Sequence, residues 1–501
     1  MINKKILNIA VVGIMTCTLA SCSEEYLTIP ADGKETELNY YKDESQAFAG
    51  LVAAYDPIRK NSGGFENMIT MMDAGSDDQY AGGGGETDGI GIQSFSNYSQ
   101  SGFTVPRSFW SDHYQGIFRT NILVKKLPDV PMDAAKKTRF VAEAKALRAL
   151  YYFNLVRMFK NIPLILDPVD PTQMYNITQA TPAEVYKQIE ADLVAAINDL
   201  PATVTSSELG RLSKGAAKAL LGKVYLYDGK KAEAAAQLAD VNGTPGGTSQ
   251  YGYKLLSNFA DLWVTNNKFH SEAIIECSHT NLSFAGWGNW GSGSDRGNSV
   301  CVMVGPRGYN KKTANAPDLP AGWSFNVFTQ DFYDFMKNDP RFSSTIFDLK
   351  ALKASGDADY VPGYKDTGYF LKKFLPTQAD VSTEAGDAVL NYKKDSYIIR
   401  LADTYLLEAE ALGATGSRAQ ALLDAVRARV GLPSVPVSMQ TIKDERRREL
   451  AGEGHRFFDL VRWGDAATVL ASRGFKANKN EIFPIPYQEL QDTKLVQNPN
   501  Y

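Results

Sequence analysis

Residues able to do covalent chemistry are few and scattered in this chain. The sequence contains no serine-centred nucleophile elbow, no glycine-rich phosphate loop and no Cys-x-x-Cys pair. No two histidines have the spacing of metal ligands, and we interpret all of them as structural: His113, His270, His279 and His455. We therefore expect a protein that binds its ligand and is not an enzyme.

The carboxylates Asp77 and Asp78 are adjacent in the sequence. A glycosidase needs two carboxylates on opposite sides of one bond, about 5 to 10 Å apart, and adjacent residues rarely supply that arrangement. The same acidic, glycine-rich region could hold calcium through carboxylates and carbonyls, but it lacks the spaced pattern of a calcium loop. We predict no metal site and no cofactor, with bound calcium as the weaker alternative.

A sugar-binding constellation is better represented. A sugar ring has an apolar face of C–H groups and a rim of hydroxyls, so a flat aromatic side chain and nearby polar groups bind it well. The candidate aromatic platform is Trp287, Trp290, Tyr309 and Trp323. The candidate polar rim is Asp77, Asp78, Asn97, Asn289 and Arg296, with Phe95 and Tyr98 beside it. A single loop tryptophan is as well suited to packing within its own loop as to contacting a ligand. The prediction therefore rests on the whole group of aromatic residues.

The elements that must position these residues are mainly helices. Asp43 or Ser45 can cap a helix that runs to about Arg59. Apolar spacing predicts further helices from about residue 108, over 134–159, and from 182 to about 200. Residues 71–107 have no clean period and are predicted to form a long ordered loop, a type of segment that often carries function.

An internal repeat organises the helices. Residues 213–239 and 396–430 each read as a helical hairpin that begins with a Leu-x-x-x-Tyr-Leu pattern, and residues 147–151 repeat its Leu-x-x-x-Tyr core. Ser417 and Gln420 predict a capping box at the second helix of the 396–430 hairpin. Each such pair needs a neighbour to bury its apolar stripe, which predicts tetratricopeptide-like packing. The alternative is that these are ordinary amphipathic helices whose shared Leu-x-x-x-Tyr pattern arose by chance.

Residues 242–394 form a long insertion between the two hairpins. The clearest helical period there is Phe332–Met336, and alternation over 273–278 predicts a strand. The glycine-rich stretch 281–323 holds three of the six tryptophans. The fold class that we predict is therefore mainly α. Tetratricopeptide-like pairs form a scaffold over about 40–240 and 395–470, and a loop-rich lobe with a few short strands, over about 242–394, holds the ligand.

The amino terminus carries an export signal. Residues 1–21 have a positive start at Lys4 and Lys5 and an apolar stretch too short to remain as a membrane span. The stretch ends in Leu19-Ala-Ser-Cys22, the pattern of a bacterial lipoprotein, which predicts lipidation of Cys22 and attachment to a membrane. An ordinary secretory peptide cut nearby is the alternative.

The bulk composition limits the partners. A formal net charge of −4 argues against nucleic acid, and 44% hydrophobic residues support a sizeable core. An exported compartment permits a disulfide between Cys277 and Cys301. Nothing else resembles a disulfide framework, so we favour two separate buried thiols.

The segment 444–464 is the most distinctive part of the chain. It reads as two short helices joined at Gly452 and Gly454, and the second has one apolar stripe. Asp459 can reach Arg456 or Arg462, one turn away on that helix. The charged run 445–449 is interpreted as a solvated or ion-paired helix face.

This segment resembles a known family. Glu445-Arg-x-x-Glu449 followed by Glu453-Gly-His-Arg-Phe-Phe-Asp-Leu-Val-Arg-Trp463 is similar to the C-terminal signature of the SusD/RagB family of outer-membrane nutrient-binding lipoproteins. The stretches 142–157 and 482–501 and the acidic residues after Cys22 also resemble the family. The run Gly82 to Gly85 departs from it.

The resemblance implies an architecture, a location and partners. Residues 22–501 would form a single SusD-like domain that is lipid-anchored in the outer membrane and faces the cell exterior. It would capture an oligosaccharide or polysaccharide and deliver it to a SusC-like TonB-dependent transporter. The alternative function is a helical-repeat lipoprotein that binds a peptide or protein, or serves only as the lid of the transporter.

Overall fold

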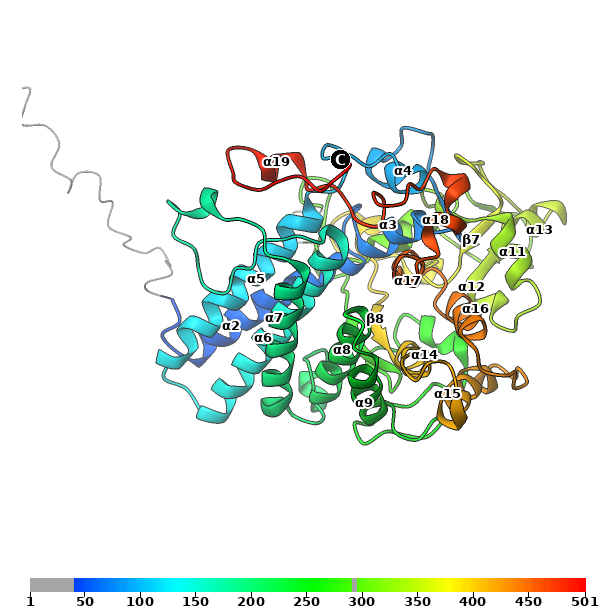
Figure 1. Cartoon of the computed structure of the whole chain (residues 1–501). Helices are drawn as coiled ribbons and strands as arrows, with labels where there is room; N and C mark the ends of the chain where they lie inside the picture. The colour runs from blue at the N-terminus through cyan, green and yellow to red at the C-terminus, as the bar shows by residue number, and fades with distance from the viewer. Residues whose placement is uncertain (1–39, 291–294) are drawn as a thin grey trace, which may run out of the picture.

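The computed structural model describes residues 40–290 and 295–501, and the predicted Cys22 lipidation site lies outside them. The described chain is mainly helical with four small two-stranded sheets, which confirms the predicted fold class (Figure 1). None of the helices in these two ranges is both long enough and apolar enough to cross a bilayer.

The first helices form one side of the molecule. They are α2 (Glu44–Tyr55), α5 (Ser108–Lys126), α6 (Ala134–Phe159) and α7 (Pro182–Asp199). The Asp43 side chain accepts from the Gln46 amide at 2.9 Å and begins α2 as the sequence predicts. Thr181 and Glu184 form a reciprocal capping box that begins α7, one residue before the proline. The predicted boundaries of these helices are therefore close to the observed ones.

The predicted hairpins stack on one another across the insertion. The first is α8 (Lys214–Tyr227) with α9 (Lys231–Asn242), and the second is α14 (Leu401–Ala411) with α15 (Gly416–Arg429). Helix α9 packs against both α8 and α14, so the series continues from the centre to the lower right of the view (Figure 1). Gly222 allows the close approach of α8 and α9, because a Cβ there would lie 2.6 Å from Leu238.

The inserted segment has its own small elements. Its helices are α10 (Ser299–Val304), α11 (Gln330–Met336), α12 (Phe342–Thr345) and α13 (Leu349–Ala354). The sheets pair β1 (Gln79–Gly82) with β4 (Phe325–Phe328), β2 (Ala273–Cys277) with β8 (Ser396–Arg400), β3 (Asn310–Lys311) with β6 (Ala358–Asp359), and β5 (Ile346–Asp348) with β7 (Tyr369–Leu371). All four pairs are antiparallel, and β2–β8 joins the two ends of the insertion.

Three local predictions were wrong. The stretch 71–107 is not one loop, because it contains the end of α3 (Met68–Ala74), strand β1 and helix α4 (Ile90–Asn97). These elements are short and buried on nearly every side, so no amphipathic period marks them. Residues 396–400 form β8, whose partner lies more than a hundred residues away. Helix α15 begins after Thr415 without a side-chain cap, so the Ser417–Gln420 box is absent.

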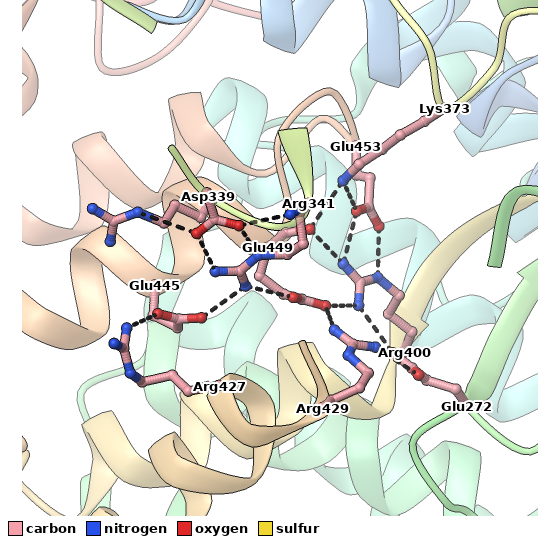
Figure 2. Close-up of polar contacts among 11 residues, drawn as sticks. Glu272, Asp339, Arg341, Lys373, Arg400, Arg427, Arg429, Glu445, Glu449 and Glu453 are labelled. Atoms are coloured by element: carbon pink, nitrogen blue, oxygen red, sulfur yellow. Dashed lines mark hydrogen bonds and ion pairs between the residues drawn. The ribbon is translucent and has the colours of Figure 1, made fainter. Parts of the chain in front are cut away.

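The C-terminal segment forms α16 (Met439–Glu449), α17 (Arg456–Trp463), α18 (Ala466–Val469) and α19 (Tyr487–Leu490). The sequence analysis interpreted the charged run 445–449 as a solvated or an ion-paired helix face. In the structure this run, in α16, is ion-paired and mostly shielded from solvent. Glu445 and Glu449, one turn apart, are fully buried and face basic side chains of the inserted segment and of the second hairpin (Figure 2).

Arg341 and Arg400 are the centres of this buried network. Arg341 donates to Glu445 at 2.7 Å and to Glu449 at 2.8 Å, and forms a two-point pair with Asp339. Arg400 donates to Glu449 at 2.6 Å and forms a two-point pair with Glu453. Neither guanidinium is exposed to solvent. Since Arg341 belongs to the insertion and Arg400 to β8, the network fixes the insertion against the C-terminal helices (Figure 2).

The network also sets a pH dependence. Burial alone would raise the pKa of Glu449, but the guanidiniums of Arg429, Arg400 and Arg341 outweigh burial and hold this pKa well below its usual value. Arg400 and Lys373 likewise outweigh burial at Glu453 and lower its pKa. A carboxyl with a lowered pKa stabilises the fold above its unfolded pKa, about 4.3 for Glu, and this stabilisation is lost as the pH falls through the folded value.

We expect Glu449→Gln to lower the free energy of unfolding at pH 7 by about 3 to 5 kcal/mol, because three buried guanidiniums lose a charged partner. The difference between wild type and variant shrinks on acidification below about pH 4.3, because the unfolded chain then takes up a proton at Glu449 while the folded protein keeps this carboxylate ionised. Urea unfolding as a function of pH measures both effects. The control is Asp334→Asn, which removes an exposed pair with Lys337 and leaves stability unchanged. Equal stability of Glu449→Gln and wild type at pH 7 contradicts the structural role of the network.

Candidate functional site

Three tryptophans that are separated in the sequence lie together in the structure. The ring centroids of Trp287 and Trp323 are 5.9 Å apart, and their planes differ by 31°. Trp290 stands nearly perpendicular to both, with centroids 5.7 Å from Trp287 and 5.5 Å from Trp323. Trp287 is 57% exposed, which is unusual for so large an apolar side chain. The cluster therefore presents an indole surface to solvent.

The backbone around the cluster is firmly held. Trp323 lies two residues before β4, and its amide donates to the carbonyl of Val302 in α10 at 3.0 Å. The Trp287 amide donates to the Asp387 carboxylate at 3.1 Å. The Trp290 indole N–H donates to Ser299 Oγ at 3.1 Å. Each tryptophan is thus fixed by a different contact, and the exposed surface does not depend on ring packing alone.

Below the tryptophans lies Phe65, which the sequence analysis missed. Its ring centroid is 6.0 Å from that of Trp290 and 6.4 Å from that of Trp323. It is also 5.2 Å from the buried Phe325 of β4. Phe65 therefore connects the exposed indoles to the core. No sequence signal marked it, because it lies in a short segment without period.

A polar edge adjoins Trp323. Arg307 Nε donates to the Trp323 carbonyl at 2.9 Å, and its Nη2 lies 2.7 Å from Asp88 Oδ2. The side chains of Arg307 and Asp88 are each about one third exposed. The Gly84 amide donates to the same Asp88 oxygen at 2.6 Å, and the Gly83 amide donates to the Ser324 carbonyl at 2.8 Å. The glycine run therefore lies against this edge. Neither charged residue was predicted; only the acidic, glycine-rich composition around Asp88 could have marked it.

Two predicted rim residues lie in the same chain segment as the tryptophans. The Asn289 side-chain oxygen accepts from the Gly286 amide at 2.7 Å and holds the turn between Trp287 and Trp290. Arg296 is 44% exposed and pairs with Asp56, just after α2, at 2.9 Å. Asn289 is thus adjacent to the tryptophan cluster, whereas Arg296 is directed toward the first helix.

The predicted carboxylates Asp77 and Asp78 do not form a ligand rim, and this part of the prediction is corrected. Arg456 of α17 makes a two-point pair with Asp77 at 2.8 and 2.9 Å, and Arg447 of α16 bonds to Asp78 at 2.6 Å. These pairs lower the pKa of Asp77 against the effect of its burial. At Asp78, burial dominates over Arg447 and raises the pKa to about 6. Both carboxylates anchor the segment between α3 and β1 to the C-terminal helices.

Three further candidates lie away from the tryptophans. Phe95 is 1% exposed and packs on Phe483, so it belongs to the core. Tyr98 is buried, and its hydroxyl donates to the Gly75 carbonyl. Both are corrected, because a buried side chain cannot contact a ligand. Asn97 is exposed, but its side chain accepts from Ser99.

Tyr309 belongs to a separate apolar cluster. Its ring packs against Phe347 at 6.2 Å, and its hydroxyl donates to the Pro317 carbonyl at 2.6 Å. No ring contact joins Tyr309 to the tryptophans within the described residues. The aromatic platform is therefore Trp287, Trp290 and Trp323, without Tyr309.

The described residues include no group of three or more histidine, cysteine or acidic side chains that could hold a metal ion. Cys277 and Cys301 are separate buried thiols, as the sequence favoured, and burial raises the pKa of each to about 12. These groups offer no reactive nucleophile at neutral pH. The chemistry that the site offers is an indole surface with a guanidinium and a carboxylate beside it, which suits a ligand with flat apolar faces and hydroxyl edges.

Comparison with known proteins places the chain among relatives. A family model described as "SusD family" matches residues 323–477, and one described as "Starch-binding associating with outer membrane" matches residues 89–226. A solved "Laminarin binding SusD-like protein" is 63% identical, with a TM-score of 0.91 over 92% of this chain and 100% of its own. Surface glycan-binding protein A from Bacteroides fluxus is 28% identical, with a TM-score of 0.79 over 91% and 99% of the two chains. SusD-like protein P25 of Formosa agariphila is 26% identical over 537 residues, covering 97% of each chain.

We expect Asp77→Ala to lower the free energy of unfolding by about 2 kcal/mol, because Arg456 loses a partly buried, charged two-point partner. Asn97→Ala, at another predicted rim position, removes only an exposed hydrogen bond with Ser99 and should lower stability by less than about 1 kcal/mol. Chemical unfolding of both variants measures the difference. Matching stabilities for Asp77→Ala and wild type argue against the anchoring role assigned to this carboxylate.

Proposed function

Because the chain belongs to the SusD family, we propose that it is a cell-surface glycan-binding lipoprotein whose ligand is a laminarin-type β-1,3-glucan. In this proposal the tryptophan cluster binds the glucan. A partner TonB-dependent transporter of the SusC type then receives it. The protein contributes binding and orientation, and no bond of the glycan is broken on it.

The observation that carries the proposal is the exposed indole surface of Trp287 beside Trp323. Two indole planes inclined by 31° can each cover the C–H face of a sugar ring in a chain that turns between residues. The 63% identical relative is described as laminarin binding, and its likeness to this chain supports the same ligand class here.

The alternative is a helical-repeat lipoprotein whose ligand is a protein or peptide, or which acts only as a lid. An apolar groove favours it. The groove has a volume of about 600 Å³ and lies between α5, the segment 163–177 and the segment 488–495. Phe118, Met174 and Tyr175 are each more than half exposed there. Exposed apolar side chains of this kind are typical of protein contact surfaces, so this face is the natural place for the transporter under either proposal.

The location is part of the proposal. The matching family description refers to the outer membrane, and the lipoprotein pattern ending at Cys22 supplies an anchor. We place the mature protein on the outer leaflet, facing the cell exterior.

We expect Trp287→Ala and Trp323→Ala each to weaken the binding of laminarihexaose at least about tenfold, because each removes a sugar-stacking face worth more than about 1.4 kcal/mol. Isothermal titration calorimetry measures this. Tyr309→Ala is the matched control, since it removes an aromatic residue of the same lobe that lies outside the cluster, and it should bind as wild type does. Wild-type protein that binds no glycan yet co-purifies with the transporter supports the alternative, and release of reducing ends contradicts the absence of catalysis.

A second prediction concerns the anchor. Cys22→Ser removes the thiol that accepts the lipid, so the protein should no longer incorporate labelled palmitate and should leave the membrane fraction. Glycan affinity in solution should be unchanged, because the site lies in a different part of the chain. A Cys22→Ser protein that still incorporates label contradicts the predicted anchor position.

A further inference from the structure

Two glycines beside the tryptophan cluster have no structural reason to be glycine. At most described glycines, either a positive φ or a close neighbour excludes a side chain. Gly85 and Gly288 are the only ones, within residues 40–290 and 295–501, that combine an ordinary φ with open space on the Cβ side. A Cβ built at either position meets no atom of these described residues within 4 Å. The fold itself would therefore accept a side chain at both.

Both positions border the proposed binding surface. Gly288 lies between Trp287 and Trp290, directly beside the most exposed indole. Gly85 ends the four-glycine run, next to the pair formed by Arg307 and Asp88. Arg307 in turn contacts the Trp323 carbonyl at 2.9 Å. The two bare positions thus lie on different loops that meet at one tryptophan cluster.

The rest of the glycine run is explained by packing. Gly82 and Gly83 have positive φ angles of 68° and 86°, and a Cβ on Gly83 would lie 2.5 Å from the Phe325 ring. A Cβ on Gly84 would lie 3.0 Å from Arg307 and 3.1 Å from Asp88, so Gly84 leaves room for that ion pair. Packing accounts for Gly82 to Gly84, and only Gly85 is left without an intramolecular cause.

A glycine that packing does not require weakens the folded state, because it enlarges the conformational freedom of the unfolded chain. Close approach of the backbone to a ligand is a reason for such a glycine. We propose that the glucan chain lies directly on the main chain at Gly85 and Gly288, so that both positions are specificity-determining parts of the binding surface. This inference rests on the proposed function and deepens it.

The geometry gives this surface a chemical character. Bare main chain admits the edge of a sugar ring, where hydroxyls rather than C–H groups lie. Arg307 and Asp88 are about one third exposed at the same place and can donate to and accept from those hydroxyls. A glucan passing over Trp323 would therefore meet an indole on its face and a charged pair on its edge, with room made by Gly85.

The test is the replacement of each glycine by Ala and by Leu. Gly85→Leu and Gly288→Leu should weaken laminarihexaose binding at least about tenfold by calorimetry, with the alanine variants affected less. The thermal unfolding midpoint of all four should equal or exceed that of wild type, because nothing in the fold is displaced and the unfolded chain is restricted. Weaker binding with undiminished stability separates ligand contact from damage to the fold.

The control is Ala354→Leu, which adds a similar side chain at an exposed position on α13, away from the tryptophans, and should change neither affinity nor stability. Leucine variants that bind as wild type does, or that lose thermal stability, overturn the inference. If they bind normally while Trp323→Ala does not, the proposed function stands and only the role of the glycines fails. If wild type binds no glucan, both fail.

Discussion

Arg341 and Arg400 are the centres of a buried charge network that holds the insertion, β8 and the C-terminal helices together. Two guanidiniums without solvent exposure are expensive to bury unless every charge is paired. Glu449 contacts both and so couples the insertion, β8 and the C-terminal helices in one unit. Such a network holds these three parts of the chain in a single arrangement, because a displaced partner would leave an uncompensated buried charge.

This network positions the proposed binding surface, because it holds the insertion in one place against the C-terminal helices. The scaffold supplies stacked helical pairs, whereas the tryptophans come from the insertion and pack on Phe65, which in turn contacts Phe325. Strand β1 reaches the same place, because it pairs with β4, which begins two residues after Trp323. Arg447 and Arg456 hold the residues just before β1 through Asp77 and Asp78. Buried and partly buried ion pairs thus hold the segments that carry the tryptophans in place, and the exposed surface of the cluster is mostly aromatic.

The sequence predicted the type of candidate site, an aromatic surface with polar groups beside it, but it did not predict all of the residues that form it. Tryptophans in an irregular, glycine-rich stretch indicated a platform, and three of them do gather. Asp77 and Asp78 looked equally suitable as a polar rim. The sequence around a loop carboxylate does not show whether it contacts a ligand or forms an ion pair with an arginine of another segment. Their partners Arg447 and Arg456 lie more than 350 residues away in the sequence, so no local pattern could identify them. The actual polar edge, Arg307 with Asp88, joins two distant loops for the same reason.

Apolar periodicity, caps and proline positions are local properties of the chain, and they were enough to predict α2, α6, α7 and the two hairpins. The sequence also lacks familiar catalytic motifs, and its first residues predict an export signal. The folded structure was needed to see which charges are buried, which aromatic residues are exposed, and that β8 is a strand rather than part of a helix. Those properties depend on partners brought together across the insertion. Burial and pairing over such distances follow from the three-dimensional packing and leave no periodic trace along the chain.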